Sequence, residues 1–289
     1  MKIPESELII NADGSVFHLH IRPDQLADTV FLVGDPGRVG NFKSLFTSLE
    51  CEGASREFVW ATGMYNGKRV TVLGTGIGPD NIDIVMTELD ALANIDFKTR
   101  EVKTEHKALD ILRVGTCGAI QPEIPVGAYI LSNISVGFDG LMNWYAGRDK
   151  FALLDFEDAF VKHTKWNSKL PAPYFVRASE SIIEKMRGCT VKGMTISAPG
   201  FYGPQGRVVR QGLVMPDMIR DIESFEFDGY KITNFEMEGA ALAGMAANLG
   251  HNAATVCFAI AHRYHQSANT DYKMEMDKFV KTMLDAMTA

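Results

Sequence analysis

The sequence predicts an α/β protein with three layers, in which helices cover both faces of a central, mixed and partly parallel sheet. Two observations lead to this prediction. Short runs of β-branched and apolar residues recur along the chain, and helical patterns lie between them. Because parallel strands need a crossover between them, this alternation is typical of a sheet that is covered by helices.

The predicted strands share runs of apolar and β-branched residues bounded by turn-forming ones. They lie at 29–34, 69–74, 110–115, 127–136, 173–178, 190–197, 230–237 and 253–260. The first three end in glycine, as strands do when they bring backbone close to a ligand. In open α/β sheets, ligands bind at the carboxyl ends of strands, so we expect the site there.

Three helices are predicted between the strands. Apolar residues recur at steps of three and four over 82–93 and 276–287, and the segment 239–250 is rich in small residues that suit close packing. Two segments interrupt the pattern. Residues 97–108 are strongly charged and predict an exposed loop or a helix extension, and residues 141–170 predict a surface excursion.

Length and charge limit the class of protein. A chain of 289 residues with 46% hydrophobic residues can form one large domain, so we take 1–289 as a single domain. The net charge of −7 argues against partners such as nucleic acid or an anionic membrane. No signal peptide, membrane-spanning stretch or paired cysteine motif is apparent, so we expect a reduced, cytoplasmic protein without a disulfide framework or zinc knuckle. The widely spaced cysteines are Cys51, Cys117, Cys189 and Cys257.

Two strand ends carry groups that suit a small anion. The segment 34–39 follows a strand and opens a helix, so its backbone N–H groups could face an anion beside Arg38, although the same letters also form an ordinary turn. A second strand ends in 113–118, with an arginine, a threonine and two glycines. Arg56 is a candidate third cation, and the alternative for it is a solvated surface arginine.

A pair of carboxylates follows a later strand. Glu236 and Glu238 are two residues apart, so in an extended strand they share one face. This spacing does not fit a glycosidase, whose two carboxyl groups must flank the scissile bond. A carboxylate here can accept hydrogen bonds from a sugar diol, and the alternative is a pair of surface acids.

Taken together, these segments resemble the nucleoside phosphorylase family over residues 17–263. The motifs, in the family's order, are GDPGRV at 34–39, SREF at 55–58, GTGIG at 74–78, RVGTCGAI at 113–120, FYGPQGR at 201–207 and NFEMEGAAL at 234–242. The resemblance implies an enzyme of the pentosyltransferase class with no cofactor, in which inorganic phosphate is a co-substrate. It also implies a homo-oligomer, either a dimer or a hexamer of dimers, whose active sites are shared between subunits.

The resemblance assigns roles to individual residues. The predicted phosphate ligands are Gly34, Arg38, Arg113 and Thr116, with Arg56 reaching in from a neighbouring subunit. The predicted ribose ligands are Glu238, Met237, the nearby Glu236, and His18 from the adjacent subunit. The predicted base contacts are Phe201, Gln205, Arg207 and Arg263. Some members of the family hold a monovalent cation between subunits near the position of Glu57, so the resemblance allows for such an ion in this protein too. His262 and His265 lack the partners that would complete a metal site.

The base segment favours a pyrimidine. Gln205 offers a donor and an acceptor and Arg207 offers a fork of donors, which match the imide edge of uracil. Purine-specific relatives carry an aspartate after the late strand, and residues 259–263 of this chain contain none. We therefore expect phosphorolysis of uridine to uracil and ribose 1-phosphate, with Arg207, Gln205, Arg113 and Glu238 as catalytic residues. Alternatives are a purine nucleoside phosphorylase, a hydrolytic nucleosidase and a non-catalytic nucleoside-binding protein.

Overall fold

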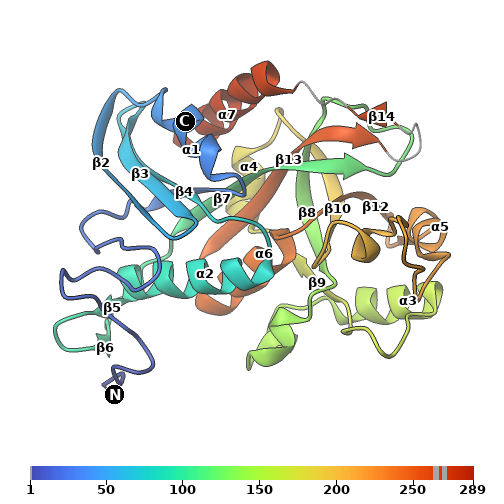
Figure 1. Cartoon of the computed structure of the whole chain (residues 1–289), viewed down its shortest axis with the longest axis horizontal. Helices are drawn as coiled ribbons and strands as arrows, with labels where there is room; N and C mark the ends of the chain where they lie inside the picture. The colour runs from blue at the N-terminus through green and yellow to red at the C-terminus, as the bar shows by residue number, and fades with distance from the viewer. Residues whose placement is uncertain (1, 263–266, 269–271) are drawn as a thin grey trace.

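The computed structural model describes residues 2–262, 267–268 and 272–289. A mixed sheet runs through the molecule with its strands in the order β11-β12-β10-β8-β13-β7-β1-β4-β3-β2 (Figure 1). The strands are β1 (Thr29–Val33), β2 (Ser48–Ser55), β3 (Phe58–Tyr65), β4 (Lys68–Gly74), β7 (Asp110–Ala119), β8 (Tyr129–Gly137), β9 (Tyr174–Arg177), β10 (Val191–Ser197), β11 (Glu226–Phe227), β12 (Tyr230–Glu236), β13 (Asn252–His262) and β14 (Ser267–Ala268). All eight strands predicted from the sequence are present.

The sheet brings distant strand ends together. β4, β1, β7 and β13 run parallel, and Leu32 of β1 and Thr255 of β13 flank Arg113 of β7 in the register. β12 pairs with β10 and, at Asn234 and Ala119, also with β7. The pairings of β7, β13, β8, β10 and β12 therefore close into a ring. As a result, the end of β12, which carries Glu236, lies beside the end of β7.

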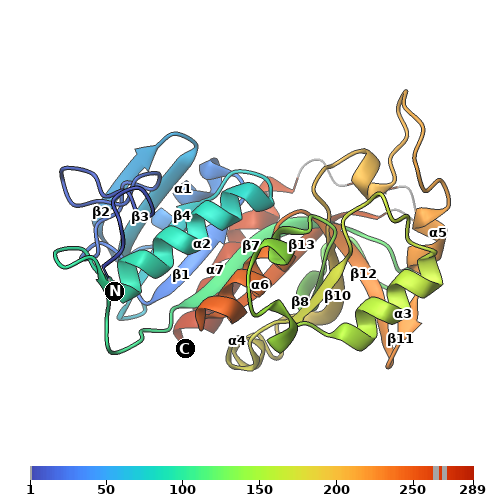
Figure 2. The same ribbon diagram turned by 90° about the horizontal axis from the view of Figure 1, so that it is seen from below.

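Helices cover both faces of the sheet, as predicted. Successive side chains of a strand point to opposite faces. Val30 and Leu32 accordingly pack in one cluster with α2 and α6, whereas Phe31 and Val33 pack in another with α1, α4 and α7. Figure 1 shows α7 on one side of the sheet and α2 with α6 on the other, and Figure 2 shows α2 and α6 from their own side.

The helices are α1 (Val39–Lys43), α2 (Pro79–Asn94), α3 (Leu154–Thr164), α4 (Glu180–Lys185), α5 (Met218–Glu223), α6 (Gly239–Leu249) and α7 (Lys273–Thr288), with short 3-10 turns η1 (Pro36–Arg38), η2 (Leu141–Trp144), η3 (Arg148–Lys150) and η4 (Gly203–Gln205).

The segment 141–170 is only partly a surface excursion. It contains α3, whose Phe156 and Phe160 are buried in a third core cluster beside β9 and β10. Burying an aromatic ring of this size contributes roughly 1.5–3 kcal/mol, which explains why the helix docks on the sheet. Trp144, in contrast, is 87% exposed.

The charged segment 97–108 is an exposed loop and not an extension of α2. The helix ends at Asn94, and the chain then forms a short hairpin of β5 (Ile95–Asp96) and β6 (Glu101–Val102). Lys103 fastens the segment by donating a hydrogen bond from its ammonium group to the carbonyl of Ala93 at 2.8 Å. Among the described residues, no helix combines the length and the apolar character needed to span a bilayer.

Candidate active site

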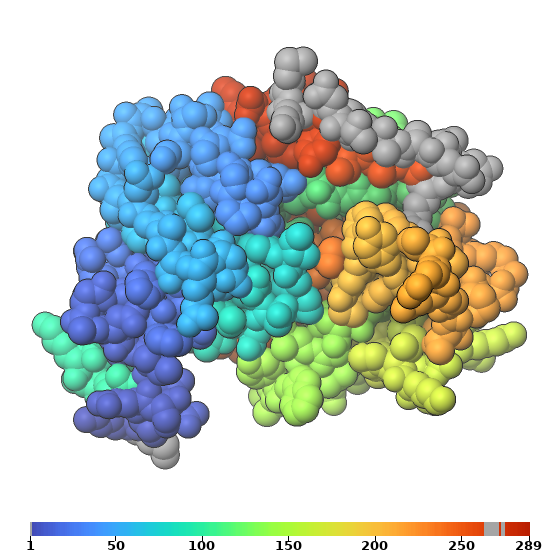
Figure 3. All heavy atoms as spheres, in the orientation of Figure 1, coloured from blue at the N-terminus to red at the C-terminus, as the bar shows by residue number. Residues whose placement is uncertain are grey.

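One cleft contains most of the residues that the sequence predicts for the site. It has a volume of about 950 Å³ and lies where the ends of β1, β7 and β12 meet the segment that follows β10. In the space-filling view, a hollow separates the blue to cyan surface from the yellow to orange surface (Figure 3). Ten predicted residues line the cleft: Gly34, Arg38, Arg113, Thr116, Phe201, Gln205, Arg207, Glu236, Met237 and Glu238.

Two parallel strands supply the predicted phosphate ligands. The turn after β1 carries Gly34 and Arg38, and the Asp35 carboxylate stabilises this turn by accepting a hydrogen bond from a backbone N–H group at 2.8 Å. β7 carries Arg113 and Thr116. A Cβ atom on Gly34 would lie only 3.9 Å from Nη2 of Arg113, so the backbone of the turn lies close to this guanidinium. The sheet thus brings the two segments to one end of the cleft.

Arg113 is buried and held by two carboxylates. Its Nη1 atom lies 2.9 Å from Oε2 of Glu236, and its Nη2 atom donates to Oε2 of Glu238. Burial opposes the charge of the guanidinium, but Glu238 and Glu236 outweigh burial and raise the pKa of Arg113. Each terminal nitrogen of an arginine has two hydrogens. Nη1 of Arg113 also donates a long hydrogen bond to Sγ of Cys257 at 3.8 Å, so Nη2 is the nitrogen that retains a hydrogen for an anion in the cleft.

Glu236 is hydrogen-bonded on both carboxylate oxygens. It accepts from the backbone N–H groups of Glu238 and Gly239, each at 2.9 Å, and from the hydroxyl of Ser197. Because α6 begins at Gly239, the carboxylate also interacts favourably with the positive end of this helix. These bonds orient Glu236 towards Arg113. Its role as a ribose ligand stays a prediction.

Glu238 faces the start of another helix. Its Oε1 atom accepts a hydrogen bond at 2.8 Å from the N–H group of Gly78, which precedes α2. Burial raises the pKa of the Glu238 carboxyl, and the negative charge of Glu236 adds to this effect, while Arg113 opposes it. A carboxylate held in this way is a fixed acceptor on the floor of the cleft.

The predicted base contacts form one connected unit. Nη1 of Arg207 donates to Oε1 of Gln205 and to the carbonyl oxygen of Phe201, both at 2.6 Å. The guanidinium of Arg207 lies 3.8 Å from the centre of the Phe201 ring, which is a close cation–π contact. Gln205 is only 4% exposed, so its amide is fixed in place. Arg263, the remaining predicted base residue, lies outside the described residues.

Arg56 and His18 do not line the cleft of their own chain. Both lie in another surface region, where the guanidinium of Arg56 is 5.5 Å from the centre of the Phe17 ring. Nδ1 of the neighbouring His18 is 2.6 Å from a carboxylate oxygen of Glu88 on α2. The two residues predicted to come from a neighbouring subunit are therefore close to one another and are not among the residues that line the chain's own cleft, although Glu57, next to Arg56, does line it.

Several residues of the cleft were not predicted. Cys117, in contrast, lies within the predicted phosphate segment 113–118, and burial raises the pKa of its thiol well above the usual range, which argues against a nucleophile. Ile77 lies within the GTGIG motif at 74–78, just after the end of β4, and this position was the available indication. Tyr272 precedes α7 and had no local sequence indication at all. The other lining residues without a prediction include Asn81, Phe235, Ile260 and Ala261.

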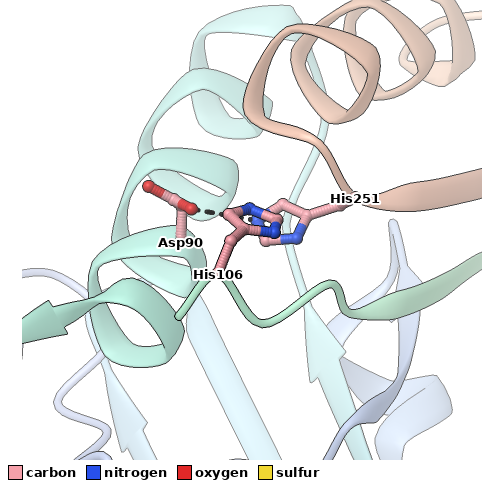
Figure 4. Close-up of side chains that lie close together, drawn as sticks. All are labelled: Asp90, His106 and His251. Atoms are coloured by element: carbon pink, nitrogen blue, oxygen red, sulfur yellow. Dashed lines mark ion pairs between the residues drawn. The ribbon is translucent and has the colours of Figure 1, made fainter. Parts of the chain in front are cut away.

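Three residues with metal-ligand chemistry meet outside the cleft. The ligand atoms of Asp90, His106 and His251 lie within 4.8 Å of one another (Figure 4). Nδ1 of His251 accepts a hydrogen bond from the N–H group of Leu109 at 3.1 Å. The proton of the neutral ring is therefore on Nε2, which lies 3.2 Å from a carboxylate oxygen of Asp90. A metal at Nε2 would need the lone pair there. Since His106 also bonds the carbonyl of Leu249 at 2.9 Å, we interpret the three as structural support that joins the charged segment to α2 and α6.

Comparison with known proteins identifies the family. A family model described as the phosphorylase superfamily matches residues 28–289. This chain belongs to the phosphorylase superfamily. A uridine phosphorylase from Thermococcus kodakarensis is 30% identical over 251 residues, which cover 87% of this chain and 79% of that protein. A purine nucleoside phosphorylase of the DeoD type from Tolumonas auensis is 27% identical and covers 93% of this chain and 97% of that protein.

The fold of this chain is similar to that of a solved structure. A nucleoside phosphorylase from Trypanosoma brucei, described as showing uridine phosphorylase activity, superposes with a TM-score of 0.88 at 28% identity. The superposition covers 98% of this chain and 100% of the other. The predicted α/β fold and the predicted membership of the nucleoside phosphorylase family are confirmed, and so is the prediction of an enzyme.

Proposed function

We propose that this chain is a uridine phosphorylase, which uses inorganic phosphate to split uridine into uracil and ribose 1-phosphate. The observation that carries the proposal is the connected unit of Phe201, Gln205 and Arg207 in the same cleft as Arg113 and Glu238. One end of the cleft offers donors and an amide to a flat heterocycle. The other end offers cations to an anion, with a carboxylate between them for a sugar.

The base end suits a uracil that leaves with negative charge. Uracil has two carbonyl groups on either side of one N–H group, and these match the amide of Gln205 and the donor fork of Arg207. When the bond between C1′ and the base nitrogen breaks, negative charge spreads onto the base carbonyl groups. A guanidinium that is already in place stabilises this charge as it develops. Burial lowers the pKa of Arg207, but an arginine stays protonated at neutral pH.

The phosphate end needs more than Arg113. With both carboxylates ionised, one guanidinium and two carboxylates carry a net charge of −1, which does not attract phosphate by itself. Arg38 lines the same cleft and supplies one further cation. The Arg56 of a neighbouring subunit would supply another, which supports an active site completed by a second chain.

The carboxylate Glu238 suits the ribose. It can accept hydrogen bonds from the ribose hydroxyl groups, and its negative charge stabilises the positive charge that builds on the sugar. A phosphate oxygen forms the new bond to C1′ as the bond to the base breaks. Holding both reactants in line turns their encounter into a positioned attack, so the chain needs no covalent intermediate.

An assay of base release tests the proposal. The purified chain is incubated with uridine, with and without phosphate, and the release of uracil and ribose 1-phosphate is followed. We expect uracil only when phosphate is present, and turnover of inosine that is lower by at least about a hundredfold, because its base leaves buried polar groups unpaired. Faster turnover of inosine would favour a purine nucleoside phosphorylase, and uracil release without phosphate would favour a nucleosidase. Uridine binding without turnover would indicate a binding protein.

A further inference from the structure

Ser197 is a buried residue that forms a hydrogen bond to Glu236, one of the residues that line the cleft. It is the last residue of β10, is 1% exposed, and does not line the cleft. Its hydroxyl donates a hydrogen bond to Oε1 of Glu236 and accepts one at 2.8 Å from the N–H group of Ala240 in α6. A single hydroxyl thus connects a sheet strand, the start of a helix and a buried carboxylate.

The connection continues to the predicted phosphate ligand. The other carboxylate oxygen of Glu236, Oε2, forms an ion pair with Nη1 of Arg113 at 2.9 Å. Nε of Arg113 has no hydrogen-bond partner among the described residues. Since Nε forms no such bond, the direction of the guanidinium depends mainly on the two carboxylates that hold its terminal nitrogens, with a longer hydrogen bond from Nη1 to Sγ of Cys257 at 3.8 Å beside them. Glu238 has a separate anchor at Gly78, whereas Glu236 is oriented by Ser197 and the backbone of α6.

We propose that Ser197 is a positioning residue for phosphate: its hydroxyl fixes Glu236 in the orientation that holds Arg113 ready for the anion. The inference rests on the proposed function, because it assumes that Arg113 binds phosphate. Without the hydroxyl, Oε1 of Glu236 keeps only its bond from the N–H group of Gly239, so the carboxylate is held less firmly and can shift. The guanidinium of Arg113 then moves together with the carboxylate to which it is paired. A displacement of about 1 Å of such a phosphate ligand is enough to weaken binding and catalysis.

The location of Ser197 gives the proposal a second consequence. The base segment 201–207, which contains Gln205 and Arg207, begins shortly after Ser197, with residues 198–200 between them. Ser197 therefore holds the strand from which the base segment starts and the carboxylate that orients the phosphate ligand. Removing its hydroxyl should weaken the binding of phosphate more than the binding of the nucleoside. Glu238 keeps its hydrogen bond from the N–H group of Gly78, and the base segment keeps its internal hydrogen bonds.

The matched control is Ser132, a serine on the neighbouring strand β8. It is also fully buried, and its hydroxyl donates to Oγ1 of Thr195 at 2.8 Å instead of to a carboxylate of the cleft. Ser132→Ala and Ser197→Ala each remove one buried hydroxyl from the same sheet. If Ser197 had only a structural role, both variants should have a lower melting temperature, and their affinities for phosphate should be equal.

The experiment compares phosphate binding by calorimetry, without nucleoside, for the wild type and the variants, alongside their steady-state kinetics. We expect Ser197→Ala to weaken phosphate binding and raise the phosphate KM by about tenfold, with a change in the uridine KM of less than about threefold, as for loss of a hydrogen bond to a charged group. Ser132→Ala should bind phosphate within about twofold of the wild type, and Ser197→Thr, which keeps the hydroxyl, should regain most of the affinity.

Two results would overturn the inference. One is phosphate affinity of Ser197→Ala within about twofold of the wild type, and the other is an equal loss in Ser197→Ala and Ser132→Ala. Failure of the proposed function looks different. A wild-type protein that binds phosphate but releases no uracil would refute uridine phosphorolysis, while the phosphate affinities of the variants would still decide the role of Ser197.

Discussion

Nη1 of Arg113 lies 2.9 Å from Oε2 of Glu236, and both side chains are at most 5% exposed. The two residues are far apart in sequence, on β7 and β12, and the antiparallel pairing between these strands brings them together. The ion pair is therefore both part of the fold and part of the predicted phosphate site. Changes that break it should alter stability as well as activity.

Replacing Arg113 should show both effects. Arg113→Met leaves Glu236 and Glu238 buried without their cation, so we expect a loss of about 3–5 kcal/mol in the free energy of unfolding. We also expect kcat/KM for uridine to fall by at least about a hundredfold. Denaturant unfolding and steady-state kinetics measure the two. The control is Arg187→Met at a side chain that is 71% exposed, where stability should change by less than about 0.5 kcal/mol. A stable Arg113→Met protein would contradict this interpretation of the ion pair.

Replacing Arg207 should separate activity from stability. Arg207→Met removes the bonds to Gln205 and Phe201 at the rim of the cleft, while the core clusters stay intact. We expect kcat/KM for uridine to fall by about a hundredfold or more, with a change in melting temperature of only a few degrees. Arg210→Met, at an exposed arginine shortly after the base segment, serves as the control and should keep near wild-type activity. Unchanged turnover in Arg207→Met would contradict the assignment of the base site.

The Glu238 carboxyl should make stability depend on pH. Its pKa in the folded protein is raised above the ordinary value of 4.5, chiefly by burial, so the folded state binds the proton more tightly than the unfolded state. Stability from this group is then greatest at low pH and is lost as the pH rises from about 4.5 through the raised pKa. Glu238→Gln removes this loss.

Urea unfolding at several pH values measures this effect. We expect the free energy of unfolding of Glu238→Gln, relative to the wild type, to increase between about pH 4.5 and 7. Glu123→Gln, at an exposed carboxyl, controls for the loss of one charge. A difference between Glu238→Gln and the wild type that stays constant over this range would show that the carboxyl titrates normally.

Mixing inactive variants should test whether subunits share active sites. Arg56→Met and Arg207→Met damage different sides of a shared site, so a hybrid dimer contains one site with both changes and one intact site. After subunit exchange at equal concentrations, about a quarter of the wild-type activity should return. Arg38→Met mixed with Arg207→Met is the control, because both residues line the same chain's cleft and no intact site forms. No recovery in the first mixture would argue against a shared site.

The sequence was less informative where local pattern and packing disagree. β2 and β3 were not predicted, although β3 is largely buried. Their glycines weaken the strand pattern, yet they are needed for packing: a Cβ atom on Gly53 would lie 2.7 Å from the Trp60 ring, and one on Gly63 would lie 2.5 Å from the Phe46 ring. The reason for these glycines is visible only when the strands are paired.

The sequence by itself determined the eight predicted strands, the main helices and ten residues of the cleft, because periodic apolar patterns and short motifs are local properties of the chain. Only the tertiary structure decided which of these residues touch. Arg113 was predicted as a phosphate ligand, but its partners Glu236 and Glu238 are reached through strand pairing across more than a hundred residues. The support from Ser197 and the absence of Arg56 from the lining of its own cleft have the same cause. Contacts between distant segments depend on register and packing, which no local pattern contains.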